Sequence, residues 1–254
     1  MRRMVLVLAV AVVVMGGCVV NCCCNKSKFK AVNVLNFAEE QAKFFAASTE
    51  NGAIEVTGYS EGVCKLTAEV EVRAADQAKA DEYVHKVVVR FERDGDTVKA
   101  SVDRHEVPKD VYVSVKFNAA VQAATGLELS SVNGSISTQG IAGAVRATTV
   151  NGSITTDVQA GDVKVSTVNG SIKLHFAKDS KASSIDGHTV NGSAFVNLPD
   201  GFGGSAKLNT VNGSIHSDVE LTVKGKLGKS VDAKIGTGTG RLDISTVNGS
   251  VRLE

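Results

Sequence analysis

The chain has 254 residues with 28 basic and 27 acidic side chains, and its formal charge of +1 gives no electrostatic argument for nucleic acid as a partner. Hydrophobic residues make up 43% and charged residues 22%, which excludes a disordered chain, and only two prolines exclude a collagen-like one. Glycine is abundant at 25 residues, whereas aromatic residues make up only 5%. The core must therefore be built from valine, isoleucine, leucine and alanine, in many short strands joined by tight turns.

The N-terminal segment has the features of an export signal. A short basic start is followed by an apolar run over residues 5–15, which is shorter than the roughly 20 residues that a membrane-spanning helix needs. The run ends in Met15-Gly16-Gly17-Cys18, which resembles the lipobox of bacterial lipoproteins. That resemblance implies a signal peptide over residues 1–17 and lipid attachment at Cys18 after cleavage. The alternatives are an ordinary secretory signal and an uncleaved anchor.

A lipid anchor predicts a location in the bacterial cell envelope. Each buried acyl methylene contributes about 0.8 kcal/mol, so several acyl chains on one residue hold a protein to a bilayer durably. Residues 18–27 would then form a lipidated, Cys-rich tether, and the membrane is the first partner that we expect. Val19 is not the Asp retention signal of lipoproteins, which favours the outer membrane in a host with two membranes.

The five cysteines do not predict a disulfide framework or a metal site. Four of them crowd the tether, at 18 and 22–24, and Cys64 stands alone in a segment that alternates like a strand. The run at 22–24 lacks the paired spacing of zinc ligands, and no second cluster completes a set of four. We therefore expect no metal and no cofactor, and we interpret Cys64 as a small core residue.

Residues 28–125 differ in sequence pattern from the repeats that follow. Helix-forming residues with apolar side chains at helical spacing predict one short helix over 74–86. Two strand-like runs, 87–92 and 97–102, flank Asp94-Gly95, which is typical of a β-hairpin. Together these elements predict an N-terminal region of strands and one helix that begins and caps the repeats, since an uncapped stack would expose a sheet edge.

The decisive feature is an internal repeat over residues 126–254. Val-Asn-Gly-Ser recurs six times, and a degenerate copy, Glu50-Asn51-Gly52-Ala53, precedes the others. Small or apolar residues stand two, four and six positions before each Asn, and charged or polar residues stand between them. This period of two predicts half-buried strands on both sides of every corner. The corner residues are Asn51, Gly52, Asn133, Gly134, Asn151, Gly152, Asn169, Gly170, Asn191, Gly192, Asn212, Gly213, Asn248 and Gly249.

Two all-β folds fit this repeat. Asn and Gly both tolerate positive φ, so each copy taken singly is typical of a tight reversal, and an array of Asn-Gly β-hairpins is the alternative fold. The near-identity of the copies favours a parallel β-solenoid, or β-helix, in which each repeat is one coil and the corner asparagines stack in a hydrogen-bonded ladder. We therefore predict an all-β, repeat-built parallel β-solenoid with one short N-terminal helix.

The repeat resembles a known family. From about residue 28 to residue 254 the chain is similar to the putative adhesin domain family, a group of β-solenoid domains of otherwise unknown function in bacterial envelope proteins and lipoproteins. The shared pattern is strand, Thr-x-Asn-Gly, strand, and it is clear at residues 51–58 and 238–249. Phe117-Asn118-Ala119-Ala120 departs from the pattern, because many relatives place a proline there. The resemblance implies a fold and an envelope location more than a function.

No catalytic chemistry is predicted. Five positions before Asn, acidic and basic residues are interspersed in chain order with no two adjacent carboxylates, which fits a neutralised, solvated face better than the paired acids of a glycosidase. His188 and His216 fall on outward positions of repeats that are neighbours in the sequence, and we interpret them as surface histidines. The sequence holds none of the common nucleophile, zinc-protease or phosphate-loop motifs. Residues 220–240 form a basic, glycine-rich excursion that we interpret as a solvated loop.

These patterns together predict a non-enzymatic envelope lipoprotein. Its solenoid would present long polar faces to a glycan or an envelope protein, in adhesion, scaffolding or envelope sensing. The alternative is a carbohydrate-active enzyme, a polysaccharide lyase or hydrolase on a β-helix. That enzyme would need acidic or basic groups clustered on one outer face, with Asp186 and His188 as the first residues to test.

Overall fold

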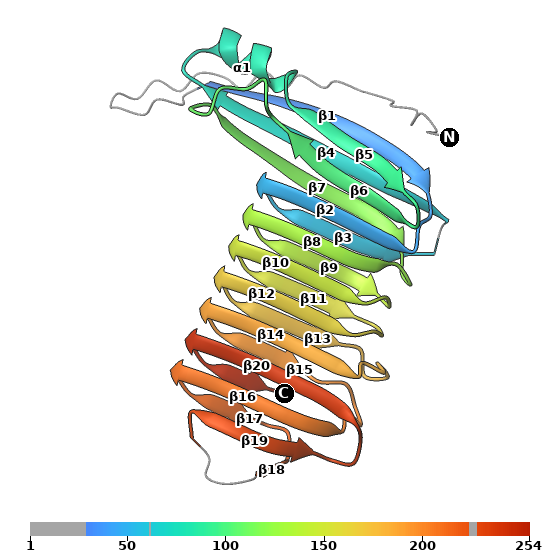
Figure 1. The fold of residues 1–254 in the computed structure, drawn as a ribbon, viewed down its shortest axis with the longest axis vertical. Helices are drawn as coiled ribbons and strands as arrows, with labels where there is room; N and C mark the ends of the chain where they lie inside the picture. The colour runs from blue at the N-terminus through green and yellow to red at the C-terminus, as the bar shows by residue number, and fades with distance from the viewer. Residues whose placement is uncertain (1–28, 61, 224–227) are drawn as a thin grey trace.

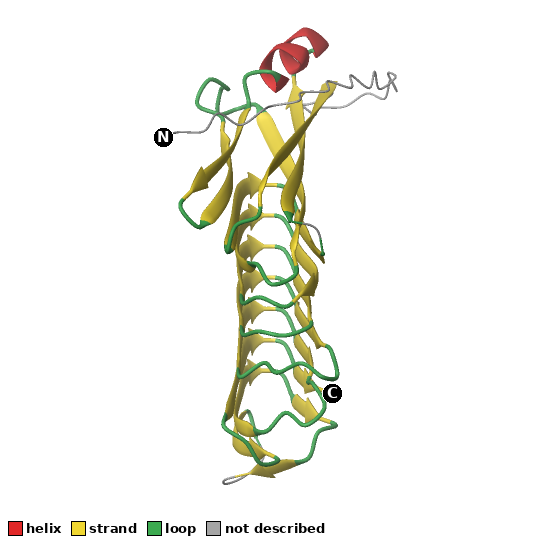
Figure 2. Ribbon diagram, turned by 90° about the vertical axis from the view of Figure 1, so that its right-hand side faces the viewer, coloured by secondary structure: helices red, strands yellow, loops and turns green. Residues whose placement is uncertain are grey.

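The computed structural model describes residues 29–60, 62–223 and 228–254 (Figures 1 and 2). The predicted signal peptide, the tether with its lipid-attachment residue Cys18, and part of the basic loop lie outside these residues. Within them, no helix has both the length and the apolar character needed to cross a membrane.

The fold is all-β, with two large, mostly parallel sheets and one short helix, α1 (Gln77–Val84). Figure 2 shows the sheets facing each other along an elongated stack. Sheet A contains, in spatial order, β1 (Phe29–Glu40), β4 (Val63–Ala74), β7 (Tyr112–Gln122), β3 (Ile54–Tyr59), β9 (Ile136–Ile141), β11 (Ile154–Val158), β13 (Ile172–Phe176), β15 (Ala194–Asn197), β21 (Val251–Leu253) and β17 (Ile215–Ser217). Sheet B contains β18 (Leu221–Val223), β19 (Ser230–Ile235), β16 (Gly204–Asn212), β20 (Gly240–Asn248), β14 (Ser184–Asn191), β12 (Val163–Asn169), β10 (Val145–Asn151), β8 (Gly126–Asn133), β2 (Phe44–Asn51), β6 (Thr97–Asp103) and β5 (Val88–Asp94).

Each Asn-Gly corner joins a strand of sheet B to a strand of sheet A, and we call such a pair of strands a rung. At Asn133-Gly134, β8 pairs with β2 and β10, whereas β9 pairs with β3 and β11. The two strands of this rung therefore lie in different sheets, as they do at the other corners, and the hairpin alternative is wrong. Equivalent strands of adjacent rungs pair in parallel and in register, so that Val145 lies between Leu127 and Val163.

The core fills the space between the two sheets. Along β12, Val163, Val165 and Thr167 are buried while the residues between them are half-buried or exposed, which confirms the predicted alternation. Isoleucine, leucine and valine fill most levels of the core, and each strand contributes its alternate, inward-facing residues. Burial weakens at the end of the stack, where Ile215 of β17 is only half-buried.

The rungs do not follow one another in chain order. The last rung of the chain, β20 with β21, lies between the rung of β14 and β15 and the rung of β16 and β17 (Figure 1). The rung of β16 and β17 therefore forms the end of the stack, where β19 adds antiparallel to β16 and β18 to β19. The interpretation of residues 220–240 as a solvated loop is wrong for these two strands, because Val231, Ala233 and Ile235 of β19 are buried. The sequential order expected from the sequence is wrong here. The 36 residues from Asn212 to Asn248 allow the chain to turn back and insert its final rung.

Antiparallel strands extend both sheets beyond the rung of β2 and β3. In sheet A, β4 pairs with β1 and β7, and in sheet B, β5 and β6 form the hairpin that Asp94-Gly95 predicts. Helix α1 is shorter than the predicted 74–86 and packs against β1 and β4. It begins after Asp76, whose side chain accepts a hydrogen bond from the Lys79 backbone N–H at 2.8 Å, so an ordinary N-cap sets its first turn.

Cys64 is buried in β4, as predicted. Burial raises the pKa of its thiol to about 12, and the negative charge of Glu39 acts in the same direction. The thiol therefore stays protonated at physiological pH, and an inert core role follows, because thiolate is the reactive form of cysteine.

Candidate interaction surfaces

The corner asparagines form a continuous ladder along one edge of the stack. The side-chain Nδ2 of every corner asparagine except Asn51 donates to the Oδ1 atom of the asparagine in an adjacent rung, at 2.7 to 2.8 Å, whereas Nδ2 of Asn51 donates to the carbonyl oxygen of Val113. In spatial order the ladder runs through Asn51, Asn133, Asn151, Asn169, Asn191, Asn248 and Asn212. All but Asn51 are exposed, so this expected ladder lies on the surface, where it fixes the register of the rungs.

The corner glycines permit close contact between rungs rather than a left-handed turn. Gly52 alone among them has a positive φ, of 134°. A Cβ atom on Gly170 would lie 2.0 Å from the carbonyl oxygen of Gly152, and the other corner glycines meet neighbouring backbone at similar distances. At the other corners, contact between stacked backbones is therefore what excludes a side chain, and not the tolerance of glycine for positive φ.

A buried hydroxyl closes each corner from the inside. Thr149, Thr167 and Thr189 each donate through Oγ1 to the carbonyl oxygen of a corner glycine in the adjacent rung, at 2.8 to 2.9 Å. Ser131 donates in the same way to the carbonyl oxygen of Gly52. The Thr, Asn and Gly of the repeat are thus occupied in holding the rungs together.

The inserted final rung creates a charged cluster that chain order conceals. Asp186 of β14 and Asp243 of β20 are register partners on the outer face of sheet B, so two carboxylates are adjacent where the sequence predicts none. Nη2 of Arg241 lies 3.1 Å from Oδ2 of Asp243, and its Nε lies 4.0 Å from Oδ1 of Asp186. Nδ1 of His188 lies 2.7 Å from Oγ of Ser245 in the same two rungs. We call these five residues the charged cluster.

The two histidines singled out in the sequence are not neighbours. His188 is in β14 of sheet B, whereas His216 is in β17 of sheet A at the end of the stack. His216 is the register partner of Arg252, and its Nε2 lies 2.9 Å from Oγ of Ser214. Their placement on different sheets excludes a shared metal or acid–base role.

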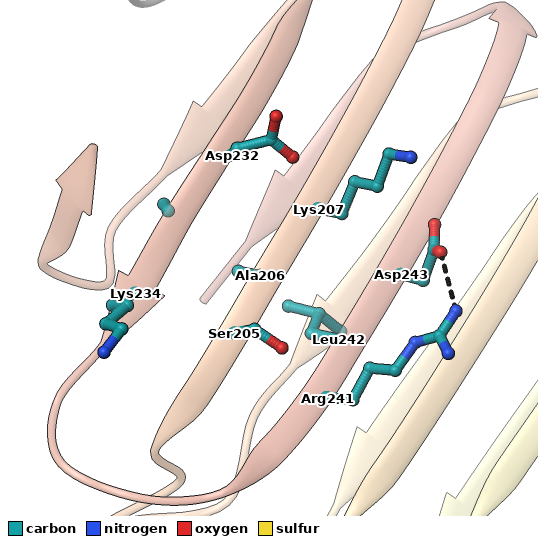
Figure 3. A pocket seen from close by; sticks show the side chains of 9 residues that line it. Ser205, Ala206, Lys207, Asp232, Lys234, Arg241, Leu242 and Asp243 are labelled. Atoms are coloured by element: carbon teal, nitrogen blue, oxygen red, sulfur yellow. Dashed lines mark hydrogen bonds and ion pairs between the residues drawn. The ribbon is translucent and has the colours of Figure 1, made fainter. Parts of the chain in front are cut away.

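A hollow of about 350 Å³ adjoins the charged cluster on β16, β19 and β20 (Figure 3). Its charged side chains are Lys207, Asp232, Lys234, Arg241 and Asp243. Lys207 lies in register between Asp243 on one side and Asp232 on the other. The hollow therefore offers alternating positive and negative groups, which suit a polar ligand that carries both donors and acceptors.

The charged cluster lacks the composition of a metal centre. In the part of the chain that the structure describes, no group of three or more His, Cys, Asp or Glu residues is placed to hold a metal ion. Arg241 lies within ion-pair distance of both carboxylates, Asp186 and Asp243, and balances much of their charge. What the arrangement provides is a set of hydrogen-bond and ion-pair partners held on adjacent, paired strands.

No known family model and no curated protein match the sequence. Among solved structures, the chain is similar to a putative cell adhesion protein from Clostridium sporogenes, at 11% identity and a TM-score of 0.45, over 86% of this chain and 97% of that chain. A putative adhesin from Bacteroides fragilis gives 11% identity and a TM-score of 0.42, over 87% and 97%. A putative lipid binding protein from Parabacteroides distasonis gives 9% and 0.33, over 88% and 96%. Further bacterial neighbours are also named putative adhesins, and at these identities and TM-scores none of them transfers a function to this chain.

Sequence reasoning misses the charged cluster because the cluster depends on the spatial order of the rungs. In chain order the neighbour of Asp186 is Lys207, but the inserted rung puts Asp243 in that place. One feature of the sequence could have indicated the inserted rung. The interval of 36 residues before Asn248 is twice the spacing of 18 between the first full repeats. An interval of that length leaves room for an excursion and a return to the stack.

Proposed function

We propose that the chain is a non-enzymatic lipoprotein of the bacterial cell envelope, anchored through a lipid on Cys18. In this proposal the two-sheet stack is a β-solenoid rod that displays the charged cluster and its hollow to a glycan or an envelope protein. The role is adhesion, scaffolding or envelope sensing, and no cofactor takes part. In a host with two membranes, the expected location is the outer membrane.

The observation that carries the proposal is the charged cluster beside its hollow. A stack held together by hydroxyl, amide and backbone groups does not need charge on its outer face, yet Asp, Arg, Lys and His gather where β14, β20, β16 and β19 lie side by side. Adjacent strands are about 4.8 Å apart, so these groups stand at a regular spacing on a rigid sheet. Few, fixed polar groups around a concave surface are typical of sites that orient a ligand.

Binding is tested with the full chain immobilised and a panel of envelope glycans, neutral and acidic, together with peptidoglycan fragments. We expect retention of at least one class with a submillimolar dissociation constant, weakened about tenfold or more by Arg241→Gln. Arg252→Gln is the matched control, because Arg252 is also ion-paired and half-exposed but lies on the outer face of sheet A. Equal losses in both variants would remove the charged cluster from the proposal, and a panel of glycans and envelope proteins without a single binder would contradict it.

The anchor is tested by fractionating cells that express Cys18→Ala. The variant is expected in the soluble fraction, since the signal would no longer provide a lipid-carrying residue, while Cys22→Ala remains with the membrane. Membrane retention of Cys18→Ala would refute lipidation. Protease treatment of whole cells then separates a surface role, in which the rod is degraded, from a periplasmic one, in which it is protected.

The enzymatic alternative makes a different prediction on the same outer face. A polysaccharide lyase or hydrolase would turn over a member of the glycan panel, and Asp186→Asn or His188→Ala would abolish that turnover. We expect no release of reducing ends or unsaturated products by the wild-type chain. Turnover that depends on either residue would replace the adhesion proposal by an enzymatic one.

A further inference from the structure

The valine of each Val-Asn-Gly-Ser repeat is exposed, which sequence patterning alone does not explain. The six valines are 38% to 55% exposed, and they make up six of the eleven exposed large hydrophobic side chains of the described residues. We call them the valine stripe. In spatial order it consists of Val132, Val150, Val168, Val190, Val247 and Val211.

The valine stripe is straight and regular. Each valine precedes a ladder asparagine, so the register of the ladder is also the register of the stripe. At about 4.8 Å per strand, six valines span about 24 Å. They lie at the arrowhead ends of the sheet B strands, which line up along one edge of the stack in Figure 1. The edge is therefore a narrow apolar ridge beside a neutral amide ladder.

The two ends of the valine stripe carry opposite charges. Glu50 occupies the position equivalent to valine in the rung of β2, next to Val132, and its exposed carboxylate lies 3.8 Å from Nη1 of Arg104, which balances part of its charge. At the other end, the exposed Lys229 lies beyond β16, and its Nζ donates to the carbonyl oxygen of Val211 at 2.5 Å. A partner that lies along the stripe thus meets an acidic group at one end and a basic group at the other.

We propose that the valine stripe is the contact surface of a homodimer in which a second copy lies antiparallel. A second stripe has the same spacing, so its valines meet those of the first level by level, and a two-fold axis midway between Val168 and Val190 makes the contact self-complementary. This arrangement places Glu50 opposite Lys229 of the partner subunit at both ends. A parallel arrangement would place like charges together, which disfavours it.

The contact area sets the strength of this dimer. A ridge one side chain wide and about 24 Å long covers less than the roughly 800 Å² per partner of a standard stable interface, so the dimer belongs to the weak, transient class. The dimer itself does not require the proposed lipid anchor or the charged cluster.

The first test is sedimentation equilibrium of the full chain in density-matched detergent with a reductant. We expect a reversible monomer–dimer equilibrium, in which Val168→Glu with Val190→Glu lowers association at least about tenfold. Phe195→Glu is the control, because Phe195 is equally exposed but lies on β15 in sheet A, away from the stripe. A monomer at every concentration up to millimolar, or a dimer that the stripe variants leave intact, overturns the proposal.

Charge reversal tests the antiparallel arrangement without disturbing the apolar contact. Glu50→Lys or Lys229→Glu alone is expected to lower association about threefold to tenfold, and the double variant is expected to restore it. A parallel dimer would not be rescued by the double variant, which would overturn the arrangement. Arg241→Gln is expected to keep the dimer intact, so failure of the dimer and failure of the proposed glycan site are distinguishable.

Discussion

The stacked rungs and the N-terminal region consist of similar strands, but different groups hold them together. Between rungs, the same two kinds of bond recur at each level. Asparagine amides bond to asparagine amides, and threonine hydroxyls donate to glycine carbonyls. In the N-terminal region, ion pairs join unlike residues across antiparallel strands. Lys30 of β1 pairs with Glu71 of β4, for example, which also pairs with Arg73 of its own strand, and Arg90 of β5 pairs with Asp103 of β6.

The contrast follows from what each geometry places side by side. Parallel stacking of a repeat puts each residue next to its own copy, and a charged residue in such a column would meet its like. Neutral groups that both donate and accept, such as amides, avoid that repulsion. Antiparallel strands without a repeat place different residues opposite each other, so opposite charges can pair. The stack is therefore expected to depend on close contact at its corners, and the N-terminal region on its ionisation state.

The largest expected effect is steric and lies in the stack. In Gly170→Ala, a Cβ atom 2.0 Å from the Gly152 carbonyl oxygen meets backbone that cannot rotate away. We expect the free energy of unfolding to fall by about 3 kcal/mol or more, measured by urea denaturation followed by far-UV circular dichroism. Gly62→Ala is the control, since nothing lies within 4 Å of its Cβ position. Equal destabilisation of both variants would rule out the contact between rungs as the cause.

Removal of a buried hydroxyl gives the next largest effect. Whether it lowers the free energy of unfolding depends on whether the hydroxyl has a hydrogen-bond partner. Thr167 donates to the carbonyl oxygen of Gly152, so Thr167→Val removes this bond and is expected to cost about 1 to 2 kcal/mol. The hydroxyl of Thr156 is buried without a hydrogen-bond partner, so Thr156→Val is expected to be neutral or stabilising. The same denaturation experiment measures both. A loss of similar size in Thr156→Val would show that the cavity shape, not the hydrogen bond, determines the result.

The asparagine ladder contributes less for each residue, because its bonds are exposed to water. Asn169 bonds to both neighbours, whereas Asn212 at the end of the ladder only donates to Asn248. We expect Asn169→Ala to cost about 1 kcal/mol and Asn212→Ala about half as much. Thermal unfolding resolves this ratio, and equal costs for the two positions would mean that the number of ladder bonds does not determine the cost.

The smallest expected effect depends on pH and lies in the N-terminal region. Burial alone would raise the pKa of Glu71, but the hydrogen bonds and charges of Lys30 and Arg73 together outweigh it and lower that pKa. A lowered folded-state pKa adds stability above the ordinary range of a glutamate, and this stability is lost as the pH falls below about 4.5 through the folded-state value. Its contribution is expected to be below about 1 kcal/mol.

Tyrosine circular dichroism reports this acid transition selectively, because all three tyrosines lie between residues 59 and 112. Tyr112 is the register partner of Arg73, next to the Glu71 ion pairs. The tyrosine signal is therefore expected to change before the far-UV signal of the strands on acidification, and Glu71→Gln is expected to flatten its pH dependence. Coincident transitions in the wild-type chain would mean that the two regions unfold as one unit.

The strands of the stack are predictable from the sequence, because alternation and corner residues reveal them directly. Val163, Val165 and Thr167 are read as inward from their spacing alone, and they are buried. The order of the rungs is not predictable in this way. The ladder position of Asn248 is chemically identical to that of every other copy, so local sequence does not say which rungs it lies between.

The outer surface is harder to predict than the core. Inward positions depend only on the two strands of one rung, whereas the charged cluster depends on which rung is next to which. The role of the corner glycines cannot be predicted from the sequence either, because a left-handed turn and a close backbone contact both select glycine. The exposure of the valine stripe becomes visible only when the direction of each corner is known.

The asparagine ladder also governs how the chain ages chemically. In an Asn-Gly sequence, the glycine nitrogen can attack the asparagine side-chain carbonyl, form a succinimide and release ammonia. Here the backbone N–H of Gly152 is held by the carbonyl oxygen of Asn169 at 3.0 Å, and the amide of Asn151 is bonded on both sides. For the glycine nitrogen to attack, these bonds would have to break and the backbone at the corner would have to rotate. The same stacking that fixes the rungs therefore slows deamidation at the very dipeptides that would otherwise limit the lifetime of the protein.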